Sequence, residues 1–281
     1  MGQHFLVDPS YCRRIVHFAQ PVPGGAVVEI GAGTGRLTRA LLEAGVRVVA
    51  LEVDPRLVAW LREDLQDFTA VGRLKILPVD VLDCDWAAVV REAQSLLSPG
   101  THSSAEAGST NGEDGRISVC GNLPYNIATR IIQDVAGHAP LFDRCVFMVQ
   151  KEVAQRLAAS PGTKPYGFIS VLVQSVWRVA LGFDIPPGAF SPRPKVDSSV
   201  LRLEPLPSLL PEGEYLALRQ LLEAAFRHPR KTLRNNLVRS GLPVTLVEQA
   251  LAAVALPPQI RPEEISPEGF QRLNRVLSSA V

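Results

Sequence analysis

The sequence lacks several features that define large classes of protein. It has few cysteines, and no two of them form a Cys-x-x-Cys pair, so neither a zinc site nor a disulfide framework is predicted. The cysteines are Cys12, Cys84, Cys120 and Cys145. No apolar run reaches the length of a membrane span. Residues 2–8 carry no charged head followed by an apolar stretch, as a secretory signal would. We therefore expect a soluble cytoplasmic protein without a metal site.

An excess of charge of one sign is also absent, because the formal net charge is only +1. Any nucleic-acid contact must then be a local patch and not a global field. The chain does have apolar residues, at 46%, and a length of 281 residues. That is enough to bury a full core in one large domain, or in a core domain with a smaller one.

Strand and helix signals alternate through the first eighty residues. Apolar strand-like runs cover 27–30, 46–53 and 74–79, and helices are predicted between them at 37–44 and 55–67. Short connections of this kind imply a parallel sheet. The predicted fold class is therefore α/β, a Rossmann-like sheet with helices on both faces, followed by a small all-α C-terminal domain.

Repeated prolines from residue 205 onward mark a domain boundary, because they neither continue a helix nor donate to a sheet. This predicts a larger α/β domain over 1–204 and a small helical domain over 205–281; the motifs and the resemblance described below imply that the first is catalytic and the second binds RNA. Residues 98–115 are rich in Ser, Gly, Thr, Glu and Asn and lack apolar periodicity. They are predicted to form a mobile surface loop.

A glycine-rich loop follows the first predicted strand, with Gly31, Gly33 and Gly35 at every second position after Glu29. Glycines at this place let the backbone turn tightly and approach a ligand closely. A dinucleotide site would show Gly-x-Gly-x-x-Gly. The actual spacing is instead similar to the S-adenosylmethionine loop of class I methyltransferases, although a glycine-rich loop alone is weak evidence.

Two acids strengthen this interpretation. Glu52 ends the second strand, about twenty residues beyond the loop, where a carboxylate can accept hydrogen bonds from both ribose hydroxyls. Asp80 ends the third strand and could accept from the adenine amine. Acids also cap turns at strand ends, but here the loop, Glu52 and Asp80 follow three successive strands. The combination predicts S-adenosylmethionine as the cofactor.

The quartet Asn122-Leu123-Pro124-Tyr125 follows a fourth predicted strand, residues 117–120, at the carboxyl end where open α/β sheets bind ligands. Alone it could be a turn with a buried tyrosine. Beside a methyl donor it has a chemical role, because an adenine amine is a poor nucleophile whose lone pair is delocalised into the ring. The Asn122 side-chain oxygen and the Leu123 carbonyl can each accept one amine proton, which aims the lone pair at the methyl group. Pro124 would fix that carbonyl, and Tyr125 would stack on a base taken out of its helix.

Several segments together resemble the ribosomal RNA adenine N6,N6-dimethyltransferases, a family that modifies two adjacent adenosines near the 3′ end of small-subunit (16S) ribosomal RNA. The matching segments are residues 2–8, 29–35, 121–125, 150–154, 190–199 and 230–237. The resemblance implies cofactor contacts at His4, Leu6, Gly31, Glu52, Asp80 and Asn122. The family usually has Asn in place of His4, and histidine can also donate or accept a hydrogen bond. The resemblance also places Phe190 on the other face of the target base, although it could instead plug the core.

A cationic segment over residues 227–236 contains no acid and is predicted to track RNA phosphates. With Pro229 at a helix start, Arg230 and Arg234 would lie one turn apart on a common face. The other cations expected to contact RNA are Arg227 and Lys231 in this segment and Arg193 and Lys195 near the predicted base pocket. The alternative is a solvated basic helix face.

The motifs and the resemblance together imply an enzyme that makes N6,N6-dimethyladenosine in 16S rRNA and acts on the precursor of the small ribosomal subunit; a monomer is the simplest expectation for its oligomeric state. Three alternatives stay open. The first is the related large-subunit (23S) methyltransferase of the macrolide-resistance type. The second is a binding protein that checks subunit assembly, with methylation secondary. The third is a nicotinamide dehydrogenase, which the glycine spacing disfavours.

Overall fold

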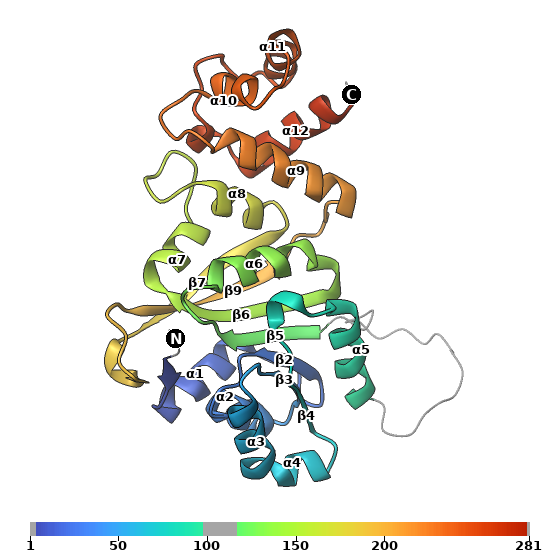
Figure 1. Cartoon of the computed structure of the whole chain (residues 1–281), viewed down its shortest axis with the longest axis vertical. Coiled ribbons are helices and arrows are strands. Elements are labelled where there is room, and N and C mark those ends of the chain that lie inside the picture. The colour runs from blue at the N-terminus through green and yellow to red at the C-terminus, as the bar shows by residue number, and fades with distance from the viewer. Residues whose placement is uncertain (1–3, 98–116, 280–281) are drawn as a thin grey trace, which may run out of the picture. The chain divides into compact units, whose positions relative to one another are not determined.

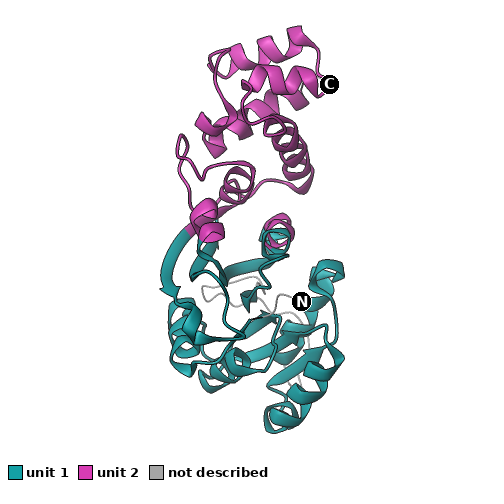
Figure 2. Ribbon diagram, turned by 60° about the vertical axis from the view of Figure 1, so that its left-hand side comes forward, with its two compact units in different colours: residues 1–131, 138–151, 180–205 teal, residues 132–137, 152–179, 206–281 magenta. Residues whose placement is uncertain are grey.

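The computed structural model describes residues 4–97 and 117–279, so Gly2, Gln3 and the predicted loop at 98–115 lie outside the described residues. The chain forms two compact units (Figure 2). Unit 1 contains residues 1–131, 138–151 and 180–205, and unit 2 contains residues 132–137, 152–179 and 206–281. The chain therefore enters unit 2 twice before the prolines near residue 205. The division into a catalytic and an RNA-binding domain stays a prediction.

A seven-stranded sheet with the strand order β4-β3-β2-β5-β6-β9-β7 carries the fold (Figure 1). The parallel strands are β2 (Ala26–Ile30), β3 (Arg47–Leu51), β4 (Leu74–Leu77), β5 (Ile117–Asn122) and β6 (Phe142–Gln150). They are followed in the order by β9 (Ser198–Pro205), antiparallel to β6, and by β7 (Trp177–Ile185). The predicted parallel β-α-β-α-β arrangement is confirmed.

The central strands are apolar on both faces because helices cover both faces of the sheet. All five residues of β2 are buried. Helices α1 (Pro9–Ala19) and α2 (Arg36–Glu43) pack on each other and contact β6 and β3, respectively, whereas α5 (Trp86–Leu97) contacts β2, β3 and β5. Because side chains alternate along a strand, one set of strand residues faces α1 and α2 and the other faces α5.

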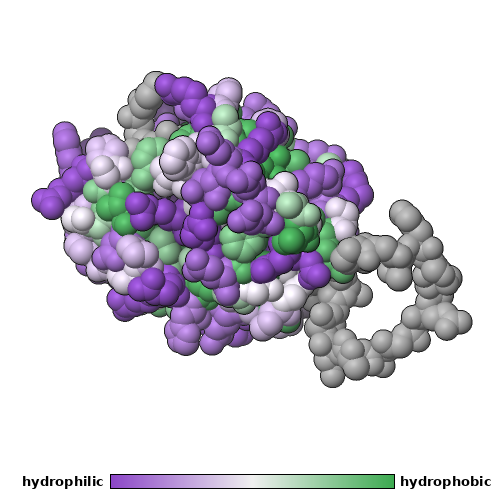
Figure 3. Space-filling view, turned by 90° about the horizontal axis from the view of Figure 1, so that it is seen from below, coloured by the Kyte–Doolittle hydropathy of each residue, from purple (hydrophilic) through white to green (hydrophobic). Residues whose placement is uncertain are grey.

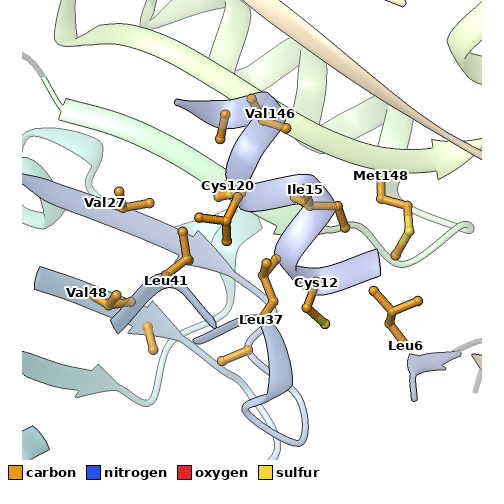
Figure 4. Close-up of a cluster of buried hydrophobic side chains, with 14 of the residues drawn as sticks. Leu6, Cys12, Ile15, Val27, Leu37, Leu41, Val48, Cys120, Val146 and Met148 are labelled. Carbon is orange, nitrogen blue, oxygen red and sulfur yellow. The ribbon is translucent and has the colours of Figure 1, made fainter. Parts of the chain in front are cut away.

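The cluster under α1 and α2 is shown in Figure 4. Cys12 and Ile15 of α1 and Leu37 and Leu41 of α2 gather over Cys120 of β5, and all of them are buried. Burial raises the pKa of the Cys12 thiol to about 11, so this cysteine is a packing residue and not a thiolate nucleophile. The cluster fixes α2, and with it the glycine-rich loop before it.

A second, two-stranded sheet joins segments that are far apart in the sequence. β1 (Phe5–Leu6) pairs antiparallel with β8 (Phe190–Ser191), with Phe5 opposite Ser191 and Leu6 opposite Phe190. The Val7 amide adds a hydrogen bond to the Ala189 carbonyl at 2.8 Å. This pairing holds the N-terminal segment beside the loop that follows β8.

The remaining elements complete both units. Beyond those named, the helices up to residue 157 are α3 (Pro55–Asp64), α4 (Gln66–Ala70), α6 (Ala128–Gly137) and α7 (Lys151–Leu157). The later helices are α8 (Phe168–Gln174), α9 (Glu212–Ala225), α10 (Leu233–Arg239), α11 (Val244–Ala253) and α12 (Pro267–Ser278). The short 3-10 turns are η1 (Val81–Asp83), η2 (Ala139–Leu141), η3 (Pro187–Ala189) and η4 (Pro262–Glu264). Within unit 2, α9 packs against α8, α10 and α12, so the predicted helical C-terminal part is confirmed.

Hydrophilic residues predominate on the face shown in Figure 3, and hydrophobic residues form separate areas between them. This distribution agrees with the burial of most apolar residues in the sheet faces and in the contacts between helices. Among residues 4–97 and 117–279, no helix combines the length and apolarity that crossing a membrane would require.

Candidate active site

A pocket of about 110 Å³ lies in unit 1, where β2, β3 and β5 end and the chain continues beyond β4. Its lining includes most of the predicted site residues: His4, Gly31, Gly33, Glu52, Asp80, Asn122, Leu123, Pro124 and Tyr125. They meet because the carboxyl ends of parallel strands lie at one edge of the sheet.

The glycine-rich loop needs glycine for two reasons. Gly31, Gly33 and Gly35 all have positive φ, at 70°, 57° and 79°, a region that other residues rarely adopt. In addition, a Cβ on Gly33 would lie 3.0 Å from the Phe5 ring, and one on Gly35 would lie 2.7 Å from the Leu61 side chain. The backbone can therefore approach a ligand without intervening side chains.

Glu52 holds this loop as well as lining the pocket. Its side chain is 3% exposed. Oε2 accepts a hydrogen bond from the Gly33 amide at 2.8 Å, and Oε1 accepts from the Val53 and Asp54 amides at 2.9 Å each. An ionised carboxylate can accept about four hydrogen bonds, so this arrangement leaves room for about one more. The sequence interpretation assigned both ribose hydroxyls to Glu52, and that contact stays a prediction.

Asp80 also combines two roles. Its Oδ1 caps the 3-10 turn η1 by accepting from the Leu82 amide at 2.9 Å, and its side chain lines the pocket. Sequence reasoning missed the two apolar residues that directly follow the acids, Val53 and Val81, which also line the pocket. Val53 keeps 56% of its surface exposed. The adenine base of a cofactor needs apolar walls. The signal that could have identified Val53 and Val81 in the sequence is therefore an apolar residue directly after each strand-end acid.

The orientation of the Asn122 amide follows from its partner. Its Nδ2 donates to the main-chain carbonyl of His4 at 2.9 Å. Because a carbonyl only accepts, the nitrogen must be the amide atom that faces it. Oδ1 is thereby left as the acceptor of this pocket-lining side chain, as the amine-orienting role requires.

The residues around Asn122 leave little freedom to the backbone. A Cβ on Gly121 would lie 2.8 Å from the Ile30 carbonyl oxygen, so no side chain fits there. The Leu123 amide donates to the Met148 carbonyl at 3.0 Å, and the Ile127 amide donates to the Pro124 carbonyl at 3.1 Å. Within the described part of the chain, no hydrogen bond engages the Leu123 carbonyl. That oxygen is available to a ligand.

Tyr125 is fixed at its hydroxyl and beside its ring. The hydroxyl lies 2.5 Å from the Ser198 Oγ on β9, and burial raises the Tyr125 pKa, which keeps the phenol neutral. The His4 ring lies 5.2 Å from the Tyr125 ring between centroids, at 36°. His4 Nδ1 lies 2.7 Å from the Pro192 carbonyl, which only accepts, so Nδ1 carries a proton. The N-terminal segment thus supports both Asn122 and Tyr125.

Replacing Ser198 by alanine should loosen the Tyr125 ring without disturbing the cofactor contacts. The hydrogen bond that this variant removes is worth about 1 kcal/mol, so we expect kcat to fall about fivefold while the dissociation constant of S-adenosylmethionine is unchanged. Single-turnover kinetics and calorimetric titration measure the two quantities. Ser199→Ala is the matched control, because Ser199 donates to Asp184 and not to Tyr125. Equal losses in both variants would contradict a specific role for Ser198.

Two of the residues predicted to contact the cofactor or the target base do not line this pocket. Leu6 is 6% exposed and Phe190 is 4% exposed, and both side chains belong to the buried core cluster, of which Figure 4 labels Leu6. For Phe190 this placement agrees with the alternative of a core plug. Cofactor contact by Leu6 and base stacking by Phe190 stay predictions, and neither is supported by the position of its side chain.

The predicted helical phase of the cationic segment is wrong. Helix α10 begins at Leu233, with Thr232 as its N-cap accepting from the Asn235 amide at 3.3 Å. Arg230 therefore lies in a turn before the helix and does not share a helical face with Arg234. Arg234 also forms an ion pair with Glu248 at 2.6 Å, which reduces its availability to a phosphate.

The turn before α10 is held by hydrogen bonds from one buried side chain. Asn236 is 1% exposed; its Nδ2 donates to the carbonyls of His228, Lys231 and Thr232, and its Oδ1 accepts from the His228 amide at 3.1 Å. The exposed cations predicted to contact RNA are Arg227, Arg230 and Lys231 in this unit and Arg193 and Lys195 in unit 1. Lys151, on the same unit as Arg193, is paired with Asp184 at 2.5 Å.

Glu29 is a buried acid beneath the glycine-rich loop, 2% exposed. Burial raises its pKa to about 8; Thr38 opposes this rise and the charge of Glu52 adds to it. Within the described residues, its Oε2 has no hydrogen-bond partner. The carboxyl group is therefore protonated near neutral pH.

This burial makes the free energy of unfolding depend on pH. Between the ordinary pKa of 4.5 and the raised value of about 8, the folded protein keeps a proton that the unfolded chain has released, so stability falls as pH rises through this range. Relative to Glu29→Gln, the protein should lose on the order of 4 kcal/mol between pH 5 and pH 9. Urea unfolding of both proteins at several pH values measures the difference. Parallel stability curves would show that Glu29 is ionised in the fold.

Together, the strand order, the glycine-rich loop with its acids and the amide at the end of β5 define a class I S-adenosylmethionine-dependent methyltransferase. The family model described as ribosomal RNA adenine dimethylase matches residues 1–257, and the chain belongs to this family. The resemblance seen in the sequence is thereby confirmed.

Curated relatives cover the whole chain. "Ribosomal RNA small subunit methyltransferase A" of Rhodospirillum rubrum is 41% identical over 100% of this chain and 88% of the relative. The protein of the same name in Geobacter metallireducens is 38% identical over 99% of this chain and 94% of the relative. Among solved structures, a dimethyladenosine transferase from Plasmodium falciparum has a TM-score of 0.72 at 22% identity, covering 96% of both chains. The 23S rRNA methyltransferase ErmE has a TM-score of 0.64 at 24% identity, covering 98% of this chain and 99% of the other. These two structures share the fold.

Proposed function

We propose that this protein transfers methyl groups from S-adenosylmethionine to the N6 amines of two adjacent adenosines near the 3′ end of 16S rRNA, giving N6,N6-dimethyladenosine during small-subunit assembly. The observation that carries the proposal is the orientation of Asn122. Its amide donates to the His4 carbonyl and so leaves Oδ1 as an acceptor, one residue from the free Leu123 carbonyl. A base amine has two N–H donors, and these two oxygens match them.

The residues of the pocket fit the cofactor. Amides of the glycine-rich loop and the remaining acceptor capacity of Glu52 suit the ribose and the amino acid part, and Asp80 with Val53 and Val81 suits adenine. When bound, the cofactor supplies an electrophilic methyl group on a sulfonium ion. No acid other than Glu52 and Asp80 lines the pocket, so within the described lining the chemistry relies on orientation.

Transfer then proceeds by positioning and electrostatics. In the first transfer, Asn122 Oδ1 and the Leu123 carbonyl accept hydrogen bonds from the two amine N–H groups and draw the nitrogen toward tetrahedral geometry, so that its lone pair can point at the methyl group. The cofactor, which the glycine-rich loop, Glu52 and Asp80 would hold, would supply the methyl group and keep the electron pair of its carbon–sulfur bond, and the nitrogen would gain positive charge. The same two oxygens stabilise that charge until a proton leaves to water. Tyr125, held by Ser198, offers its ring face to the extruded base.

The substrate class follows the names of the relatives, which are small-subunit methyltransferases. We propose the precursor of the small ribosomal subunit as the partner, a cytoplasmic location, and action as a monomer. The test uses purified protein, labelled S-adenosylmethionine, and small and large subunits from cells that lack the mark. We expect label in 16S rRNA alone, recovered as N6,N6-dimethyladenosine. Label confined to 23S rRNA would support the large-subunit alternative, and no label in either would refute the proposal.

A further inference from the structure

A second cavity in unit 1, with a volume of about 610 Å³, is not explained by the cofactor site. We call it the α1–α3 groove and define it by lining residues from four elements: Arg13 on α1, Arg36 at the start of α2, Trp60 on α3 and Ser191 on β8. Its volume lies in the range of ligand-binding clefts. Phe5 lines both this groove and the pocket, so its side chain stands between the two.

The charges of the groove favour an anion. Arg13 and Arg36 are exposed, and neither forms an ion pair within residues 4–97 and 117–279. A third cation, Arg39, is neutralised by Asp64 at 2.8 Å. Glu43 is the remaining acid of the lining, and Asp8, which interacts electrostatically with Arg13, lies outside the lining, so Arg13 and Arg36 are the lining cations without an ion pair among the described residues. Arginine suits phosphate binding better than lysine does, because the planar N–H donors of its guanidinium group match the phosphate oxygens.

The exposed indole of Trp60 favours an RNA chain over a simple anion as the ligand of the groove. Its indole is 53% exposed on the groove, although a tryptophan is usually well buried. Exposed aromatic rings beside arginines are the means by which proteins hold single-stranded nucleic acid, with the ring stacking on a base and the cations on the backbone. Ser191, which also lines the groove, lies two residues before Arg193, one of the cations predicted to contact RNA.

We propose that the α1–α3 groove binds the single-stranded RNA next to the target adenosines, with Arg13 and Arg36 on phosphates and Trp60 against a base. The proposal rests on the proposed function and adds a contact surface to it. RNA held there would continue past Phe5 into the pocket where the target amine is oriented. By holding the flanking nucleotides, the groove would set which adenosine along the RNA chain can reach the pocket.

The test measures binding of the full-length protein to unmethylated small subunits as a function of salt. For single strands, removing one phosphate interaction lowers the slope of log K against log salt by about 0.7, so Arg13→Gln/Arg36→Gln should lower it by about 1.4. Trp60→Ala should weaken binding about fivefold and leave the slope unchanged. Arg62→Gln is the matched control: Arg62 is exposed on α3 but does not line the groove. Melting temperature and S-adenosylmethionine affinity, measured on each variant, separate loss of RNA binding from loss of fold.

Two outcomes would overturn the groove proposal. If the double variant keeps the wild-type slope and affinity, the groove does not hold RNA. If its affinity falls but the slope does not, the groove binds a protein of the subunit. In either case, methyl transfer by the wild type to 16S rRNA leaves the proposed function standing, whereas a wild type that binds subunits but transfers nothing refutes that function and not the groove.

Discussion

Replacing Asn122 by alanine is expected to reduce the rate of methyl transfer by about 10²–10³-fold, the usual effect of removing one preorganised group from a site that works by electrostatics. The variant loses the acceptor that the His4 carbonyl orients. Only the Leu123 carbonyl then holds the amine, and the lone pair stays delocalised into the ring. Single-turnover kinetics with saturating cofactor and subunits measure the chemical step directly.

The control for this variant is Asn126→Ala. Asn126 is an exposed asparagine four residues further on, and it does not line the pocket. The Asn126→Ala variant should transfer methyl groups at the wild-type rate. The affinity of Asn122→Ala for S-adenosylmethionine should fall by less than about tenfold, because the variant gives up at most one neutral hydrogen bond to the cofactor. A variant that binds cofactor and subunits normally and retains near wild-type transfer would show that Asn122 does not orient the amine.

Replacing Glu52 by glutamine should weaken S-adenosylmethionine binding about 100-fold, although the two side chains have the same shape. Both oxygens of Glu52 accept hydrogen bonds from backbone amides, from Gly33 on one side and from Val53 and Asp54 on the other. Glutamine has one oxygen, so its NH₂ group must face at least one of these donors. The loss of charge-assisted hydrogen bonds to the loop and to the ribose is worth about 1.5–3 kcal/mol each.

Calorimetric titration of the cofactor measures this effect, and Glu63→Gln provides the comparison because Glu63 is exposed on α3 outside the pocket. Thermal unfolding without cofactor should also show a lower melting temperature for Glu52→Gln alone, since the glycine-rich loop loses its anchor. If Glu52→Gln binds the cofactor as tightly as the wild type does, the loop is held by other contacts and the ribose by another residue.

The site was predictable from sequence where one local pattern decides the structure. The glycine-rich loop, Glu52, Asp80 and Asn122 each follow an apolar strand, and parallel strands bring their carboxyl ends together without any further information. The main elements of the sheet followed from the same alternation of strand and helix signals.

Contacts between distant segments were not predictable. The two-residue strands β1 and β8 are too short to show a periodicity, yet their pairing sets His4 against Asn122, 118 residues away. Phe190 illustrates the same difficulty, because an aromatic residue in a proline-rich loop has the same local sequence whether it is exposed or buried. Its burial is decided by the pairing of Leu6 with it across the two strands.

The start of α10 was misplaced because two helix-start signals compete. Pro229 suits the first turn of a helix, but Thr232 is the residue whose side chain caps the helix, and Asn236 binds the preceding turn in a non-helical form. The helix α5 had no counterpart in the sequence interpretation, although its buried residues Trp86, Val89, Val90 and Ala93 repeat at helical spacing.

The most direct measurement is a map of N6,N6-dimethyladenosine in ribosomal RNA from cells that lack this protein and carry either the wild-type chain or Asn122→Ala. The wild type should restore the modification at two adjacent adenosines near the 3′ end of 16S rRNA, and Asn122→Ala, produced at the same level, should restore almost none. Full restoration by Asn122→Ala, or a modification that appears in 23S rRNA instead, would contradict the account.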